Sequence, residues 1–250
     1  MSTVSLTLLH TRYQILETIR IPIAVIGNMM FPALAMFFFV VPQEELAADP
    51  TLSTAAVGQL AMFAVMSTCL FTFGVGAAED RALPFDPYVR TLPAGPWPRM
   101  IGRMLTGGFF AMLGLIPLVL IGWLFTAASV TPGRFLAAAA VIVAVALPFL
   151  ALGLGIGYST SAKASIAVVQ VILFPMAFAG GLFMPPEILP DWLNNFSQTL
   201  PSRAGRDLLI QALTGAEASA SALPVLLGWG ALFTAFALWA YRRDEGRRFK

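Results

Sequence analysis

The sequence predicts an all-α membrane protein with six transmembrane helices in one domain that spans residues 1–250. Of its 250 residues, 58% are hydrophobic and 11% are charged, whereas a soluble domain has about 45–50% and about 25%. Six apolar runs are each long enough to cross a bilayer core of about 30 Å. Nearly all charged residues lie outside these runs. A soluble domain, a disordered chain and a disulfide scaffold are therefore excluded, the last because Cys69 is the single cysteine.

The first element, residues 1–20, is expected to be an amphipathic helix that lies on the inner membrane surface. Leu8, Ile15 and other apolar residues alternate there with Arg12 and Glu17, a pattern typical of interfacial helices. Two interpretations stay open. The helix either couples a cytoplasmic partner to the first span or serves as a surface anchor.

The six spans follow from the apolar runs, because backbone groups in hydrocarbon must all be hydrogen-bonded within a helix. No run contains Asp, Glu, Lys, Arg or His. The spans are predicted near residues 21–41, 54–78, 104–127, 135–158, 165–184 and 222–241. Gly153 and Gly157 form a GxxxG motif in the fourth span, which indicates close packing against a helix that the sequence does not identify.

The distribution of positive charge orients the chain. An even number of spans places both termini on one side, and all but three of the 15 Lys and Arg residues are assigned to that side. The other side holds Arg134, Arg203 and Arg206 together with Glu44, Glu45, Asp49, Glu187, Asp191, Asp207 and Glu217. By the positive-inside rule both termini are cytoplasmic, in the cytoplasmic (inner) membrane of a bacterium. The excess of basic residues is therefore explained by membrane topology and gives no support to nucleic-acid binding.

The cytoplasmic loop 79–103 is predicted to contain a short helix. Asp86 and Pro87 form an N-cap and first-turn pair, so a helix over 87–92 is expected to end before Pro93. It would present apolar and cationic groups to a partner, namely Tyr88, Val89, Arg90 and Leu92. The alternative is that the loop's arginines only enforce topology.

A second helix start follows at Pro96-Trp97-Pro98. Trp97 suits the membrane interface, and Arg99 and Arg103 stand one turn apart. We expect these two arginines to meet the phosphates of membrane lipids.

The external segment 178–213 predicts two short helices between spans five and six. Gly180 and Gly181 reduce the side-chain bulk at the end of the fifth span, and Pro185 ends it. Trp192 begins the first short helix. Irregular backbone at this depth is tolerated only where protein covers it or where it lines a cavity. The segment is therefore either a gate or vestibule wall, for which these four residues are the candidates, or a passive cap.

The spans contain no group that titrates, which argues against proton-coupled transport. Asn28, Gln59 and Gln170 are candidates for a substrate path, although amides in bundles also hydrogen-bond across helix interfaces. Neither Lys163 nor Lys250 lies in a phosphate-binding Walker loop. No cofactor or metal site is predicted in this chain, so an ATP-driven mechanism would require a separate subunit to bind ATP and Mg²⁺.

Two segments resemble ABC transporter permeases of the type-two exporter family. The cytoplasmic loop carries Asp80-Arg81, Thr91-Leu92-Pro93, Trp97 and Gly102-Arg103-Met104-Leu105. The external segment carries Gly180-Gly181-Leu182-Phe183-Met184-Pro185, Leu189-Pro190-Asp191-Trp192-Leu193 and Leu200-Pro201. The chain departs from the family pattern at Ala82-Leu83-Pro84, where a glycine usually follows the acidic-arginine pair.

The resemblance implies a permease subunit that works as a homo- or heterodimer with two cytoplasmic ATPase subunits. Residues 87–92 would be the coupling helix that docks on the ATPase, with Asp80 and Arg81 near that contact, and the external helices would cap the translocation path. The apolar interior favours a hydrophobic or amphipathic cargo such as a drug or a lipid. An ATP-independent carrier or channel and a membrane assembly or scaffold protein stay open as alternatives.

Overall fold

A computed structural model gives the fold and describes residues 3–20, 30–84 and 97–248. Over these residues the chain is helical and contains no strand, as expected for an all-α protein. Five helices are long and apolar enough to cross a membrane, namely Pro50–Ala82, Ile101–Phe125, Pro132–Ser159, Ala162–Ala179 and Ala222–Asp244. They correspond to five of the six predicted spans.

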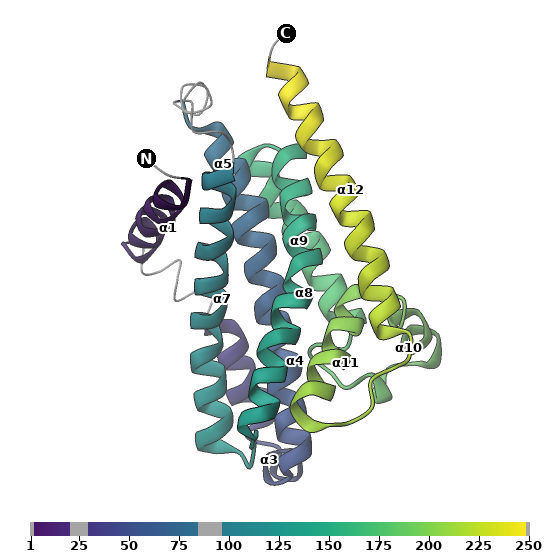
Figure 1. Cartoon of the computed structure of the whole chain (residues 1–250). Helices are drawn as coiled ribbons and strands as arrows, with labels where there is room; N and C mark the ends of the chain where they lie inside the picture. The colour runs from purple at the N-terminus through teal and green to yellow at the C-terminus, as the bar shows by residue number, and fades with distance from the viewer. Residues whose placement is uncertain (1–2, 21–29, 85–96, 249–250) are drawn as a thin grey trace.

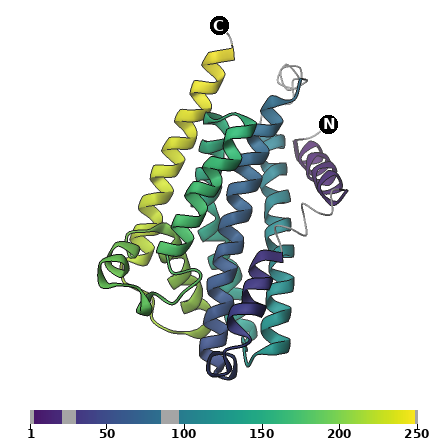
Figure 2. The same ribbon diagram turned by 180° about the vertical axis from the view of Figure 1, so that it is seen from behind.

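The region of the remaining predicted span, 21–41, is described only from residue 30. A shorter apolar helix covers Met30–Val40, and its second half, η1 (Met36–Val40), is a π-helix. Seen from behind, it lies beside α4 (Pro50–Cys69) and α7 (Trp97–Phe125) at the end of the bundle opposite the C-terminus (Figure 2). Residues 21–29 lie outside the described part.

The second predicted span is the centre of the bundle. α4 (Pro50–Cys69), the π-helix η2 (Leu70–Val75) and α5 (Gly76–Ala82) form one continuous helical segment. Asp49 caps its N-terminus by accepting from the backbone N–H groups of Thr51 and Leu52 at 2.7 and 2.9 Å. Nearly every α4 side chain from Gly58 onward is buried, so α4 is apolar on all sides.

α8 (Pro132–Ser159) packs against this central segment through the predicted GxxxG motif. A Cβ atom on Gly153 would lie 2.9 Å from the carbonyl oxygen of Cys69, and one on Gly157 would lie 2.8 Å from those of Phe73 and Gly74. The motif therefore contacts η2 and the end of α4, and only glycine allows the two backbones to approach this closely.

Segment 178–213 contains several short helices. α9 (Ala162–Ala179) ends five residues before the predicted boundary at Met184, because the chain turns at Gly180 and Gly181, the latter with φ of 72°. A 3₁₀ turn, η3 (Pro186–Ile188), and two helices, α10 (Asp191–Ser197) and α11 (Pro201–Thr214), follow. α11 packs into the bundle against α4, α8 and α12 (Ala222–Arg248).

The end of α5 and the C-terminal end of α12 lie at the same end of the bundle (Figure 1). α12 runs along α8, its main neighbour, and ends near the tip of α5 (Figure 1). α7 (Trp97–Phe125) flanks the other side of the central segment. The helices α3 (Glu44–Ala48) and α11 lie toward the opposite end (Figure 1).

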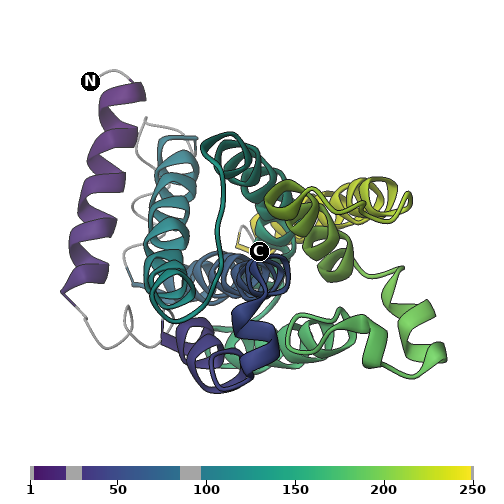
Figure 3. The same cartoon turned by 90° about the horizontal axis from the view of Figure 1, so that it is seen from below.

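A helix, α1 (Thr3–Ile19), lies in the region of the predicted N-terminal helix. Viewed along the bundle, α1 is seen along its length whereas α4 and α7 are seen end-on, so it lies across the bundle axis (Figure 3). It packs on α7, where a Cβ atom on Gly102 would lie 2.9 Å from the Cβ of His10. Large apolar side chains such as Val4, Leu8 and Tyr13 face away from the bundle and are at least 60% exposed, which suits a helix on a membrane surface.

Candidate functional site

Asp80 and Arg81 stand side by side on the last turn of α5, where the chain enters the cytoplasmic loop. The carboxylate of Asp80 forms an ion pair with Arg103 on α7. A second nitrogen of Arg103 reaches the carbonyl oxygen of Thr72 at 3.5 Å. This pair joins the end of the central helix to the beginning of the third apolar helix.

Arg81 makes the complementary contacts to the other half of the bundle. Its guanidinium forms an ion pair with Asp244 on α12 and donates to the carbonyl oxygens of Gly157 and, at 3.1 Å, Thr160 at the end of α8. It also lies 5.8 Å from the centre of the Tyr158 ring. The last carbonyls of a helix have no partner within it and carry partial negative charge. Arg81 therefore caps α8 while it holds α12.

The Arg81–Asp244 pair is shielded from solvent. The two side chains are 16% and 5% exposed, so they interact in a medium less polar than water. Removing one partner of such a pair leaves a buried charge and is strongly destabilising. Two adjacent residues thus fasten the entry of the cytoplasmic loop to α7 on one side and to α8 and α12 on the other.

The predicted partner-binding residues divide into two groups. Asp80 and Arg81 lie in the described part of the chain, where their charged groups are engaged by Arg103 and Asp244. The rest lie outside the described residues, namely Asp86, Tyr88, Val89, Arg90 and Leu92. Their contribution to a partner contact stays a prediction.

Two features of this site differ from the sequence prediction. Arg103 was expected to meet lipid phosphates, but its side chain is 13% exposed and turns inward to Asp80. Asp244 was not singled out as a site residue. The available signal was its position, because it is an acidic residue directly after Arg242 and Arg243 near the end of the last span.

The external turn holds the predicted gate glycines and one predicted path residue. Gln59 of α4 donates its side-chain amide to the carbonyl oxygen of Gly181 at 2.9 Å, and both residues are buried. Gly180 lies against Ser202 of α11, whose hydroxyl donates to the carbonyl oxygen of Met176 at 2.7 Å. A Cβ atom on Gly180 would collide with that hydroxyl. The two glycines therefore let α9 end directly against α4 and α11.

The other two predicted gate residues are on the surface. Trp192, in the first turn of α10, is 71% exposed, and Pro185 is also exposed. An exposed indole at the end of the bundle suits the membrane interface. The four predicted residues therefore form two groups, a buried turn and an exposed rim.

Aromatic rings surround this turn. Phe183 lies 4.9 Å from Phe63 on α4, 4.8 Å from Phe178 on α9 and 5.9 Å from Phe31, measured between ring centroids. Phe31 and Phe63 are themselves 5.2 Å apart. Such ring pairs stabilise beyond the area that they bury. The cluster joins the helix of residues 30–40 to the external turn.

A charged cluster holds α11 to α10, and the sequence prediction did not identify it. Arg203 donates to both carboxylate oxygens of Asp207 at 2.8 and 3.0 Å, and also to Asn194 and Ser197. Arg206 donates to Asp207 at 2.7 Å. Burial lowers the pKa of the Arg206 guanidinium, although nearby Asp207 opposes that shift. The signal in the sequence was the i, i+4 spacing of Arg203 and Asp207.

Two of the three predicted path residues lie in the described part of the chain. Gln59 is buried inside the bundle, Gln170 is exposed on α9, and Asn28 lies outside the described residues. Over the described ranges no group of three or more His, Cys, Asp or Glu side chains could hold a metal ion.

Comparison with known proteins agrees with this arrangement. The profile of the family described as "ABC-2 type transporter" matches residues 6–214. A protein of Bacillus subtilis (strain 168), named "Putative transport permease YvfS", is 22% identical over 186 residues, which cover 74% of this chain and 76% of that protein. The family match includes both the Asp80–Arg81 site and the external turn. The chain therefore belongs to the ABC-2 type transporter family.

Proposed function

We propose that this protein is the membrane subunit of an ATP-driven exporter and works with separate cytoplasmic ATPase chains. In this proposal the layout has six spans, both termini are cytoplasmic, and α1 lies on the inner surface of a bacterial membrane. The observation that carries the proposal is the position of Asp80 and Arg81 in a chain of this family. They fasten the entry of the cytoplasmic loop to three helices of the bundle.

The mechanism follows from that position. A partner that displaced the loop after Ala82 would pull on Asp80 and Arg81, because both side chains are anchored close to the start of that loop. The pull would reach α7 through Arg103 and α12 through Asp244. Small shifts of packed helices are a common way to switch between two bundle arrangements.

The coupling helix of this proposal is the predicted segment 87–92. It would dock on the ATPase through Tyr88, Val89, Arg90 and Leu92, which combine apolar and cationic groups. ATP and Mg²⁺ would be bound in that subunit, and this chain would carry no covalent chemistry.

The translocation path and the cargo are also part of this proposal. A second copy or a related subunit would complete the path, and the external turn around Gly181 would close it toward the outside. The cargo would be hydrophobic or amphipathic, for example a drug or a lipid.

The test is purification of the tagged chain from its native host in mild detergent. The proposal expects a P-loop ATPase in about equal amount, and substrate-stimulated ATP hydrolysis by the complex. A chain that runs alone under conditions that preserve complexes, and that moves cargo across vesicles without ATP, would favour an ATP-independent carrier or channel. A chain with partners but no flux under either condition would favour an assembly or scaffold role.

A further inference from the structure

The cytoplasmic half of α12 carries a stripe of residues that no contact within the described chain explains. Ala235, Leu238, Trp239, Arg242 and Arg243 line a shallow groove of about 520 Å³. Their spacing of three and four residues places them on one face of the helix. Leu238 and Trp239 are 53% and 52% exposed.

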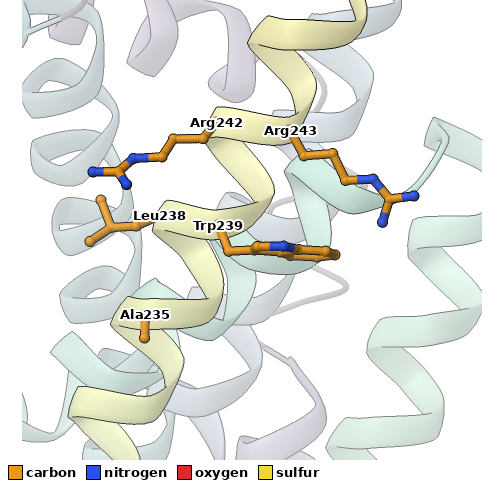
Figure 4. Close-up of a pocket in the computed structure, with 5 residues that line it drawn as sticks. All are labelled: Ala235, Leu238, Trp239, Arg242 and Arg243. Atoms are coloured by element: carbon orange, nitrogen blue, oxygen red, sulfur yellow. The ribbon is translucent and has the colours of Figure 1, made fainter.

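The shape of the groove follows from the sizes of these side chains. Ala235 forms its low end, and Leu238 and Trp239 rise on either side of the helix above it (Figure 4). Arg242 extends over the Leu238 side and Arg243 over the Trp239 side (Figure 4). The Arg243 guanidinium lies 5.1 Å from the centre of the Trp239 ring, within the range of a cation–π contact. The groove is apolar at one end and flanked by two cations at the other.

The two cations are available for an external anion. The next residue, Asp244, is 6% exposed and faces Arg81 in the interior of the bundle. Both arginines are exposed, and the carboxylates in the ion pairs found elsewhere in the bundle are engaged by other arginines. Arg243 keeps all its N–H donors, because a cation–π contact uses the face of the guanidinium.

The depth of the groove matches the edge of a bilayer. At about 1.5 Å per residue, Arg242 lies about 30 Å along α12 from Ala222, which equals the thickness of the hydrocarbon core. Ala235 lies about 10 Å closer to the centre of the membrane than Arg242 by the same measure. Phosphate groups of lipids are therefore at the level of the arginines, and acyl chains are at the level of Ala235.

We propose that this groove binds an anionic phospholipid, with the headgroup phosphate at the level of Arg242 and Arg243 and an acyl chain over Ala235 between Leu238 and Trp239. Charge complementarity favours an anionic lipid over a zwitterionic one, because basic side chains at the cytoplasmic surface attract anionic headgroups. The inference depends on the position of α12 in a bilayer and not on ATP-driven export.

The experiment measures contact between Trp239 and lipids of known charge. The purified full chain is placed in phosphatidylcholine bilayers with 10–50% phosphatidylglycerol, and bromine atoms on the acyl chains of one lipid at a time quench nearby indoles. The difference between the intact chain and Trp239→Phe isolates the signal of Trp239. We expect phosphatidylglycerol to be enriched about fivefold to tenfold over phosphatidylcholine at Trp239.

Matched variants distinguish specific lipid binding in the groove from general attraction of anionic lipids to a positively charged protein surface. Arg242→Gln with Arg243→Gln should abolish the enrichment, whereas Arg242→Lys with Arg243→Lys should retain most of it. Arg12→Gln with Lys163→Gln removes two exposed charges from α1 and α9. This control should leave the enrichment of phosphatidylglycerol at Trp239 unchanged. Folding of each variant is checked by its helical circular dichroism and its elution volume.

Three outcomes would overturn the proposal. The first is equal quenching of Trp239 by both lipids in the intact chain. The second is enrichment that survives in Arg242→Gln with Arg243→Gln. The third is no quenching by either lipid while other tryptophans are quenched, since this would mean that a second copy or another protein covers the groove.

Discussion

The side-chain amide of Gln59 donates to the carbonyl oxygen of Gly181 at 2.9 Å, across 122 residues of sequence. This bond connects the central helix to the turn that ends α9. Gly181 adopts a φ of 72° there, so its carbonyl is held in a conformation that other residues rarely adopt.

Gln59→Leu should therefore destabilise the protein by about 1–3 kcal/mol, because it leaves a buried carbonyl without a partner. The measurement is the thermal unfolding midpoint in detergent. Gln170→Leu is the control, since Gln170 is exposed on α9, and it should leave the midpoint nearly unchanged. Equal midpoints for Gln59→Leu and the intact chain would show that the bond contributes nothing.

A second prediction concerns the contact of α8 with the central segment. Gly153→Ala should destabilise by about 1–3 kcal/mol through overpacking, because the added Cβ would lie 2.9 Å from the Cys69 carbonyl oxygen. Gly108→Ala on α7 is the matched control, since nothing lies within 4 Å of its added Cβ. In an open helix position that change is expected to stabilise by about 0.5–1 kcal/mol. The prediction fails if both variants shift the unfolding midpoint in the same direction.

The ion pair between Arg81 and Asp244 gives a third prediction. Asp244→Leu should destabilise by about 3 kcal/mol, the lower part of the range for a broken buried pair, because the Arg81 side chain is 16% exposed. Arg81→Met in the same chain should recover part of that loss. A double-mutant cycle on unfolding free energies measures the coupling, and strictly additive effects would contradict a direct pair.

The charged cluster on α11 gives a fourth prediction. Asp207→Asn should loosen α10 and α11, because Arg203 and Arg206 both donate to that carboxylate and two guanidinium groups would be left without it. Trypsin should then cleave after Arg203 or Arg206 at least about tenfold faster, since proteolysis follows the population of the opened form. Glu217→Gln removes an exposed charge outside the cluster and should not change the cleavage rate.

A fifth prediction tests the proposed coupling segment by its sequence. Tyr88→Ala with Arg90→Glu should release the ATPase and abolish its stimulated hydrolysis while membrane insertion stays intact, because the change removes an aromatic contact and reverses a charge. Copurification with the ATPase and its hydrolysis rate are the readouts. Arg134→Glu reverses a charge assigned to the external side and should leave both at their original level.

Much of the fold could be predicted because lipid imposes strict rules on the chain. Apolar runs predict helices wherever hydrocarbon offers no partner to the backbone, and five such helices are found among the described residues. The end of α9 was placed at Met184 because Leu182 and Phe183 are apolar. The chain turns earlier, since Gly181 takes a positive φ and Gln59 holds its carbonyl.

The candidate site was predicted less completely. The adjacent residues Asp80 and Arg81 could be identified from the sequence, but their partners could not, because Asp244 lies 163 residues from Arg81 and Arg103 lies 23 from Asp80. Local spacing carries no information on pairs that tertiary packing brings together. Gln59 illustrates the same limit, since the sequence left open whether its amide lines a path or bonds across a helix interface, and it did not identify Gly181 as the partner.

The unbroken helix from Pro50 to Ala82 carries contacts to both ends of the molecule. It is 33 residues long, about 50 Å at 1.5 Å per residue, and it contacts the turn at Gly181 through Gln59 and the ends of α8 and α12 through Arg81. About 33 Å of helix separates these two residues. No loop interrupts the segment between these two contacts. A displacement of one end along the helix axis would therefore move the other end as well. The number of residues between Gln59 and Arg81 also fixes the relative orientation of their side chains. Inserting one residue between them would rotate one side chain by about 100° relative to the other, so both contacts could not form together.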